Sequence, residues 1–301
     1  MEEKIVKIIE EMGPLTGAEL LVAINSDPLI LLRTCRLSKK LATRIVGTRY
    51  LRLDRRIDGY ARLSPSILRE FLTYSIIGTS DDHDALERKA DKTISHIEEI
   101  SRAKSDLAYN IASSMAHRLG DEQLINEHVC FIIAGDIVFN MAHDVPRPER
   151  STGKMVKGSD MDIVVIVDDH IPEKMVKRID EEIYKEKYSL LLNPHMKEEI
   201  DYVVKDLDRV RQQIKFDTFK HMVACKILHE GALLCGSEEI FHAVKSMLKE
   251  NSVTEKLAAM EEYARVYREK AEKYLIKEDP ANFKGQDLDL FYPTEESEEF
   301  E

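Results

Sequence analysis

The chain has 301 residues, 33% of which are charged, and its formal net charge is −12 at pH 7. It contains no run of about 18 apolar residues, and the N-terminal stretch MEEKIVKIIEEMG lacks the apolar segment of a secretion signal, which argues against a membrane protein and predicts a cytoplasmic one. The length allows two or three domains, each with its own apolar core.

Charge is distributed unevenly along the sequence. Between Arg33 and Arg62, ten lysines and arginines stand against two aspartates, whereas Ala281 to Glu301 has one lysine and seven acids. The basic segment favours contact with nucleic acid in spite of the negative net charge. The acidic tail, 278–301, is predicted to be disordered, with docking onto the basic segment as the alternative.

Cysteines and histidines give no clear metal or disulfide pattern. The cysteines, Cys35, Cys130, Cys225 and Cys235, have no CxxC spacing and lie among apolar or helix-like neighbours, which predicts reduced core thiols, with zinc binding or a disulfide as the alternatives. The ten histidines show no paired spacing typical of a metal site.

Residues 1–78 are predicted to form a small domain of three helices and a hairpin. The first helix ends at Gly13-Pro14, the second begins at Thr16 with Glu19 completing a capping box, and the third begins at Asp27 with a proline after it. A turn at Asp58-Gly59 then separates two short alternating segments. This order of elements resembles a winged helix-turn-helix.

Such a domain would present basic side chains on its third helix and on its wing. We expect these residues to contact phosphates, with a protein–protein role for the same surface as the alternative. The predicted nucleic-acid contacts are Arg33, Arg36, Lys39, Lys40, Arg52, Arg55 and Arg56, with Arg62 beside them.

Residues 82–119 repeat apolar side chains at helical spacing, so 79–125 is predicted to be a helical connector. From His128 onward the pattern changes to strand, long loop, strand, helix, strand, helix and short strand. We therefore expect an α/β (α+β) fold with a mixed sheet flanked by helices over 126–245, followed by a C-terminal helix over 246–277. Lys220 and Lys226 are interpreted as ordinary surface residues of the helix that precedes Gly231.

Two aspartates open the second strand of this region, in SDMDIVVIV. Residues two apart in a strand point to the same face, so Asp160 and Asp162 should project together. Asp201, in EIDYVV, opens the next strand in the same way. Carboxylates held this close repel unless a cation lies between them, so the three predict a site for Mg²⁺ or Mn²⁺.

These parts resemble the nucleotidyltransferases of the DNA polymerase β-like superfamily. The resemblance covers about residues 126–245 and rests on IIAGD, SDMDIVV and IDYVV, with HEGALLCGSEEIF, 229–241, at the end of the core. It implies two metal ions and an NTP, with Asp160, Asp162 and Asp201 as metal ligands and catalytic residues. It also implies a nucleotide-binding role for Gly135, Asp136, Ser159 and Lys154.

The sequence departs from the family pattern in two places. Asp136 stands where the family has a serine that helps to hold the phosphates, and a carboxylate there should repel a triphosphate. The loop from Gly135 to Asp160 is unusually long and carries four basic residues that could compensate by holding phosphates, Arg147, Arg150, Lys154 and Lys157.

The function expected from the resemblance is metal-dependent transfer of NMP from an NTP to a hydroxyl acceptor, possibly a nucleic acid end. Two alternatives stay open. One is a non-catalytic, nucleic-acid-binding regulator that senses nucleotide, which the Gly135-Asp136 turn favours. The other is a transferase that modifies a small molecule.

Overall fold

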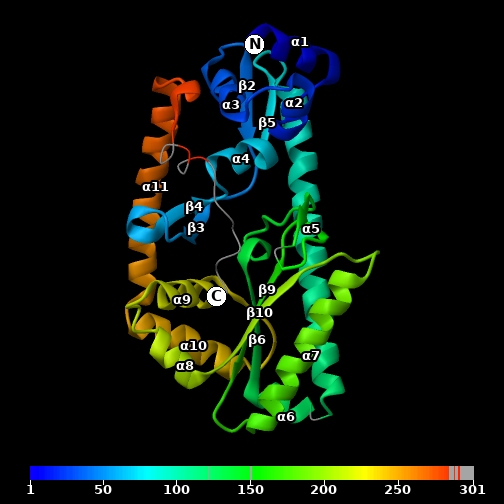
Figure 1. The fold of residues 1–301 in the computed structure, drawn as a ribbon, viewed down its shortest axis with the longest axis vertical. Coiled ribbons are helices and arrows are strands. Elements are labelled where there is room, and N and C mark those ends of the chain that lie inside the picture. The colour runs from blue at the N-terminus through cyan, green and yellow to red at the C-terminus, as the bar shows by residue number, and fades with distance from the viewer. Residues whose placement is uncertain (121, 150, 285–287, 289–290, 292–301) are drawn as a thin grey trace. The chain divides into compact units, whose positions relative to one another are not determined.

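The computed structural model describes residues 1–120, 122–149, 151–284, 288 and 291 (Figure 1). The chain has the expected mixed α/β fold and divides into two compact units. One unit contains residues 1–96 and the described part of 259–296, and the other contains residues 97–258. Within the described ranges, no helix is long and apolar enough to cross a membrane.

The first unit begins with the three predicted helices, α1 (Glu2–Met12), α2 (Gly17–Ile24) and α3 (Pro28–Leu37). The capping box is confirmed, because the Glu19 N–H donates to the Thr16 hydroxyl and the Thr16 N–H donates to the Glu19 carboxylate. Asp27 caps α3 by accepting from two backbone N–H groups. Local capping chemistry therefore fixes where both helices begin.

The strands of this unit form two sheets. One is antiparallel with the order β1 (Leu15–Thr16), β5 (Ser75–Thr79), β2 (Leu41–Ile45). The predicted hairpin is confirmed as β3 (Tyr50–Leu53) and β4 (Ala61–Ser64), joined through a 3-10 turn, η1 (Asp58–Tyr60), in which Gly59 has φ +72°. Helix α4 (Ile67–Tyr74) follows it and leads into β5.

Part of the C-terminal region belongs to the core of the first unit. Leu275 of α11 (Val253–Lys277) and Phe283, which follows the short turn η3 (Pro280–Asn282), are buried in one cluster with Ile5 and Phe71. Phe291 is also buried there, with its ring stacked 5.4 Å from that of Phe283. The prediction of disorder over 278–301 is therefore wrong at Phe283 and Phe291, because both apolar rings pack into this core. Residues 285–287, 289–290 and 292–301 lie outside the described residues.

The second unit is built on a four-stranded sheet with the order β10 (Ile200–Asp206), β9 (Met161–Val167), β6 (Val129–Ala134), β11 (Ala232–Gly236). Strands β9 and β10 are parallel, and the other two pairs are antiparallel. The predicted order of these four strands along the chain is confirmed. Nearly every residue of β6 and β9 is buried because helices cover both faces of the sheet.

One face of this sheet packs on residues 97–118 of α5 (His83–Arg118), on α6 (Glu122–His128) and on α7 (Glu173–Leu192). Helices α9 (Phe219–Glu230) and α10 (Glu238–Glu250) lie against β6 on the other face (Figure 1). The single helix expected before Gly231 is two, since α8 (Leu207–Gln213) ends before Phe216, whose φ is +58°, and Thr218 caps α9. The helix expected over 246–277 is likewise interrupted, at Ser252.

The long loop after β6 has structure of its own. It contains a 3-10 turn, η2 (Gly135–Ile137), and a two-stranded hairpin, β7 (Pro146–Pro148) with β8 (Met155–Lys157). Glu149 organises the hairpin tip by accepting four hydrogen bonds from the N–H and hydroxyl groups of Ser151 and Thr152. Burial opposes the charge of Glu149, yet these bonds lower its pKa to about 2.

Candidate metal centre at the start of strand β9

The three predicted carboxylates converge at one end of the β9–β10 pair. Asp162 lies directly opposite Asp201 in the parallel register, and Asp160 stands just before β9. One carboxylate oxygen from each residue can be chosen so that all three lie within 4.8 Å of one another. Alternation along β9 places Asp160 and Asp162 on the same face as Val164, which is opposite the α7 face.

A fourth acid and two bases lie at the same point. Glu199, which is 6% exposed, forms an ion pair with the Arg147 guanidinium at 2.9 Å, and the same guanidinium lies 3.5 Å from Asp160. On the other side, the Lys187 ammonium is 2.8 Å from Asp201. Together with Asp162, the acids here outnumber the bases by two.

This excess of negative charge, together with burial, raises the pKa of two of the acids, Asp160 and Glu199. The pKa of Asp160 is raised, because burial together with repulsion from Asp201 and Asp136 outweighs the attraction of Arg147. Burial, reinforced by Asp160 and Asp201, raises the pKa of Glu199 to about 7. Because like charges in close contact favour either protonation or a bound cation, the cluster is suited to a divalent ion.

The turn after β6 fits around Asp162. Gly135 has φ +72°, and a Cβ at this position would lie 2.1 Å from Oδ2 of Asp162. The glycine is therefore required twice, for its backbone conformation and for the space that the carboxylate occupies. Its N–H donates to Glu230 at 3.3 Å, and Glu230 pairs with Lys226 at 2.9 Å.

Both members of that last pair are buried, so the interpretation of Lys226 as a surface residue is wrong. The apolar surroundings of α9 hide the ammonium, and Glu230, one helical turn later, compensates its charge.

Asp136 and Ser159 are joined to each other. The Ser159 hydroxyl donates to Asp136 at 2.8 Å, and it also accepts the His143 N–H at 3.2 Å. Ser159 is buried, and its own N–H donates to the His143 carbonyl. A serine hydroxyl thus reaches the turn after β6 from the far end of the loop, where it binds Asp136.

The basic residues of the long loop differ in where they reach. Arg147 contacts the carboxylate cluster and also donates to the Gly158 carbonyl at 2.7 Å. Lys157 donates to the His195 carbonyl at 3.0 Å, and Lys154 has an exposed side chain at the hairpin. Arg150 lies outside the described residues.

The predicted nucleic-acid surface of the first unit is divided. Arg33 donates to the carbonyls of Leu275 and Ile276 at the end of α11, and Arg36 pairs with Glu272 at 3.4 Å. Arg52 is half-buried on β3. The predicted residues that are exposed are Lys39, Lys40, Arg55 and Arg56. Contact with nucleic acid stays a prediction, and these four side chains are the ones placed to make it.

Sequence reasoning missed Glu199 and Lys187. Glu199 precedes Asp201 by two residues, which is the same spacing that singled out Asp160 and Asp162, so the signal was present. Lys187 comes from α7, and the sequence carries no comparable signal for its position.

The donor set fits a hard divalent cation. Its members are carboxylate oxygens, the ligands that Mg²⁺ and Mn²⁺ prefer, and the excess of negative charge favours a bound ion rather than a closed salt-bridge network. Comparisons of this chain with protein-family models, curated proteins and solved structures find no match.

Proposed function

We propose that this protein is a metal-dependent nucleotidyltransferase that moves a nucleoside monophosphate from an NTP to a hydroxyl acceptor and releases pyrophosphate. The observation that supports it most is the pairing of Asp162 with Asp201 across two parallel strands, with Asp160 beside them and Gly135 leaving space for the Asp162 carboxylate. The resemblance of the ordered motifs to the polymerase β-like core points to the same reaction.

In this reaction the acceptor oxygen forms a bond to the α-phosphorus of the NTP as the bond from that phosphorus to pyrophosphate breaks. Mg²⁺ or Mn²⁺, when bound, would neutralise the phosphate oxygens and lower the pKa of the acceptor hydroxyl. Asp160, Asp162 and Asp201 would hold the ions. Asp201 would in addition help to activate the acceptor hydroxyl, which loses its proton as it bonds to the α-phosphorus, and Arg147 and Lys187 would keep the carboxylates in position.

A test is transfer of label from α-labelled ATP, GTP, CTP and UTP, with Mg²⁺ or Mn²⁺, onto total RNA, the protein itself and a pool of small molecules. The matched variants are Asp160→Asn with Asp162→Asn, which keep the shapes of the side chains. Label should appear with the wild-type chain and vanish with the double variant. Label that is unchanged in the double variant would refute the proposal, and so would no transfer in any pool.

The exposed Lys39, Lys40, Arg55 and Arg56 favour a nucleic acid as the acceptor or docking platform. A second candidate is the regulator that binds nucleotide without turnover, which the Asp136–Ser159 hydrogen bond favours because it places a carboxylate where phosphates would lie. Tight, salt-dependent RNA binding without label transfer would favour this candidate.

A further inference from the structure

A second cluster of metal-ligating side chains lies at the opposite end of the same two strands. In the antiparallel register Ala134 pairs with Asp162 at one end and Val129 with Val167 at the other. His128 directly precedes β6 at this second end, and Asp168 directly follows β9. Asp168 follows Asp162 by six positions along the strand, at a rise of about 3.3 Å per position, so the two clusters are about 20 Å apart.

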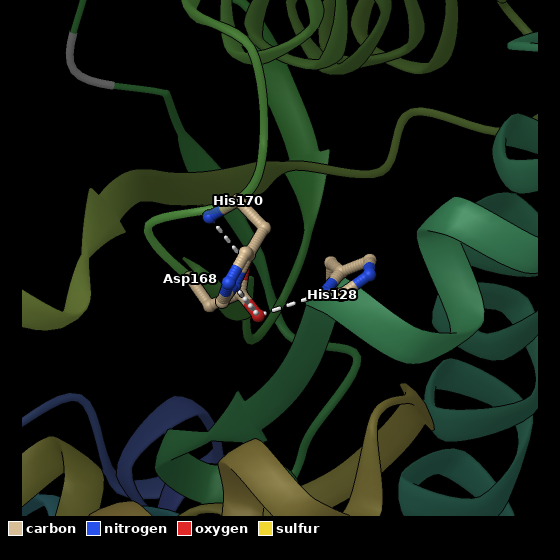
Figure 2. Close-up of side chains that lie close together, drawn as sticks. All are labelled: His128, Asp168 and His170. Atoms are coloured by element: carbon tan, nitrogen blue, oxygen red, sulfur yellow. Dashed lines mark hydrogen bonds and ion pairs between the residues drawn. The ribbon is translucent and has the colours of Figure 1, made fainter.

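The cluster contains His128, Asp168 and His170, and Figure 2 shows both imidazole rings turned towards the Asp168 carboxylate. Oδ2 of Asp168 lies 2.7 Å from Nδ1 of His128 and 3.4 Å from Nδ1 of His170. Ligand atoms of the three residues lie within 4.8 Å of one another. Two imidazole nitrogens therefore lie around one carboxylate oxygen, Oδ2 of Asp168.

Backbone hydrogen bonds hold this arrangement. The His170 N–H donates to Oδ1 of Asp168 at 2.9 Å, which orients the carboxylate so that Oδ2 faces the two rings. The Asp168 N–H donates to the His128 carbonyl at 3.1 Å and ties the start of β6 to the end of β9. A carboxylate oriented in this way is typical of a prepared ligand set.

One of the two distances matches the ligand separation around a tetrahedral zinc ion, and the other is the length of a hydrogen bond that the ion would replace. With Zn–N and Zn–O bonds of about 2.0–2.2 Å, neighbouring ligands of a tetrahedral ion lie about 3.4 Å apart. The distance from Asp168 to His170 already has this value, and the distance to His128 is 0.7 Å shorter, the difference between 3.4 and 2.7 Å. His170 is 78% exposed, which leaves room for water as a fourth ligand.

We propose that His128, Asp168 and His170 bind a borderline divalent metal ion, Zn²⁺ in preference to Mg²⁺, and that this ion clamps the α6–β6 junction to the segment between β9 and α7. Imidazole ligands select zinc, whereas the all-oxygen set at Asp160, Asp162 and Asp201 suits Mg²⁺ or Mn²⁺. The role is structural and does not depend on the proposed transferase activity. Each imidazole would coordinate through a deprotonated nitrogen, so binding of the ion releases any proton that this nitrogen carries.

The chain also contains a histidine–aspartate pair without a third ligand, which serves as a matched control. His221 lies one helical turn after Asp217 and bonds to it at 2.6 Å, and the His221 ring is 28% exposed, as the His128 ring is 27% exposed. Among the described residues, this pair is not part of a group that could hold a metal ion. A substitution of His221 therefore shows how much of the zinc binding comes from a single imidazole rather than from a set of three ligands.

The experiment is calorimetric titration of Zn²⁺ into the chelator-stripped full chain at about pH 8, because metal binding competes with protons for the ligands. All chains carry Asp160→Asn and Asp162→Asn, so that zinc cannot bind at the carboxylate cluster. We expect one ion per chain, affinity lowered at least about tenfold by His170→Ala or Asp168→Asn, and no change with His221→Ala. Because the His170 side chain is exposed, its loss should leave the fold intact.

Thermal unfolding gives an independent readout. Zn²⁺ should raise the unfolding temperature of the control chain, which carries only Asp160→Asn and Asp162→Asn. It should not raise that of the chain with His170→Ala added, and excess Mg²⁺ should not reproduce the rise. No zinc binding to the control chain would overturn the proposal. Binding that is equally tight in His170→Ala, or that Mg²⁺ abolishes, would also overturn it.

Discussion

Substitution of Gly135 by alanine should damage the metal centre more than it damages the fold. The positive φ of this residue costs a side chain about 1–2 kcal/mol of stability. The new Cβ would also lie 2.1 Å from Oδ2 of Asp162, so the carboxylate must move by about an ångström or more to reach an ordinary contact. A shift of that size moves a ligand out of the tolerance of a metal site, which is about 0.5 Å.

Gly153 provides the matched control for this change. It lies in the same loop, its φ is +67°, and a Cβ there would meet no atom within 4 Å. Gly153→Ala should therefore have the backbone cost alone. Urea unfolding should show both variants destabilised by about 1–2 kcal/mol. Binding of Mn²⁺, followed by loss of the free-ion EPR signal, should weaken at least about tenfold for Gly135→Ala and stay unchanged for Gly153→Ala.

The result that would refute this reasoning is Mn²⁺ binding by Gly135→Ala as tight as that of the wild-type chain, with the variant folded. In that case either Asp162 is not a ligand or the turn does not restrict it. Equal weakening in both glycine variants would show that the effect comes from the loop backbone rather than from contact with Asp162.

Three further outcomes are expected. Burial lowers the pKa of Lys205 to about 8. Wild-type stability should therefore rise with pH between about 8 and 10, where the unfolded chain binds more protons than the folded chain. Lys205→Met should raise the free energy of unfolding by at most about 3 kcal/mol, measured in urea at pH 7. The pKa of Glu149 is about 2, so Glu149→Gln should lower the free energy of unfolding by about 1–3 kcal/mol at pH 7. The difference from wild type should shrink as the pH falls from about 4 towards 2, and a difference that stays constant would contradict the prediction. If RNA binds, Lys39→Gln with Lys40→Gln should reduce the salt dependence of binding by about one to two units of slope, measured by anisotropy at several salt concentrations, whereas a slope equal to that of wild type would remove these lysines from the interface.

Local chemistry in the sequence predicted much of this structure. The capping residues Thr16 and Asp27, the turn at Gly59 and the strand-opening pair Asp160 and Asp162 each act over a few residues, and each lies where the pattern indicated. Features that depend on distant contacts were not predictable. Arg33 meets residues more than two hundred positions later in the chain, and no local signal distinguishes it from a solvent-exposed arginine.

The histidine cluster shows the same limit. Asp168 and His170 are two residues apart, but His128 reaches them only because β6 pairs with β9 in antiparallel register. A search for spacing along the sequence could not find a ligand forty residues away. By contrast, Glu199 was within reach of the alternation rule that found the aspartate pair, because it lies two residues before Asp201.

The measurement that tests the account most directly compares α-labelled with γ-labelled NTP in the presence of Mg²⁺, using the wild-type chain, Asp162→Asn and His170→Ala. Nucleotidyl transfer predicts that the α-label joins the acceptor and the γ-label leaves as pyrophosphate. Asp162→Asn should abolish both, and His170→Ala should keep both. Transfer of the γ-label to the acceptor, or α-label transfer that survives Asp162→Asn, would contradict a nucleotidyltransferase centred on these aspartates.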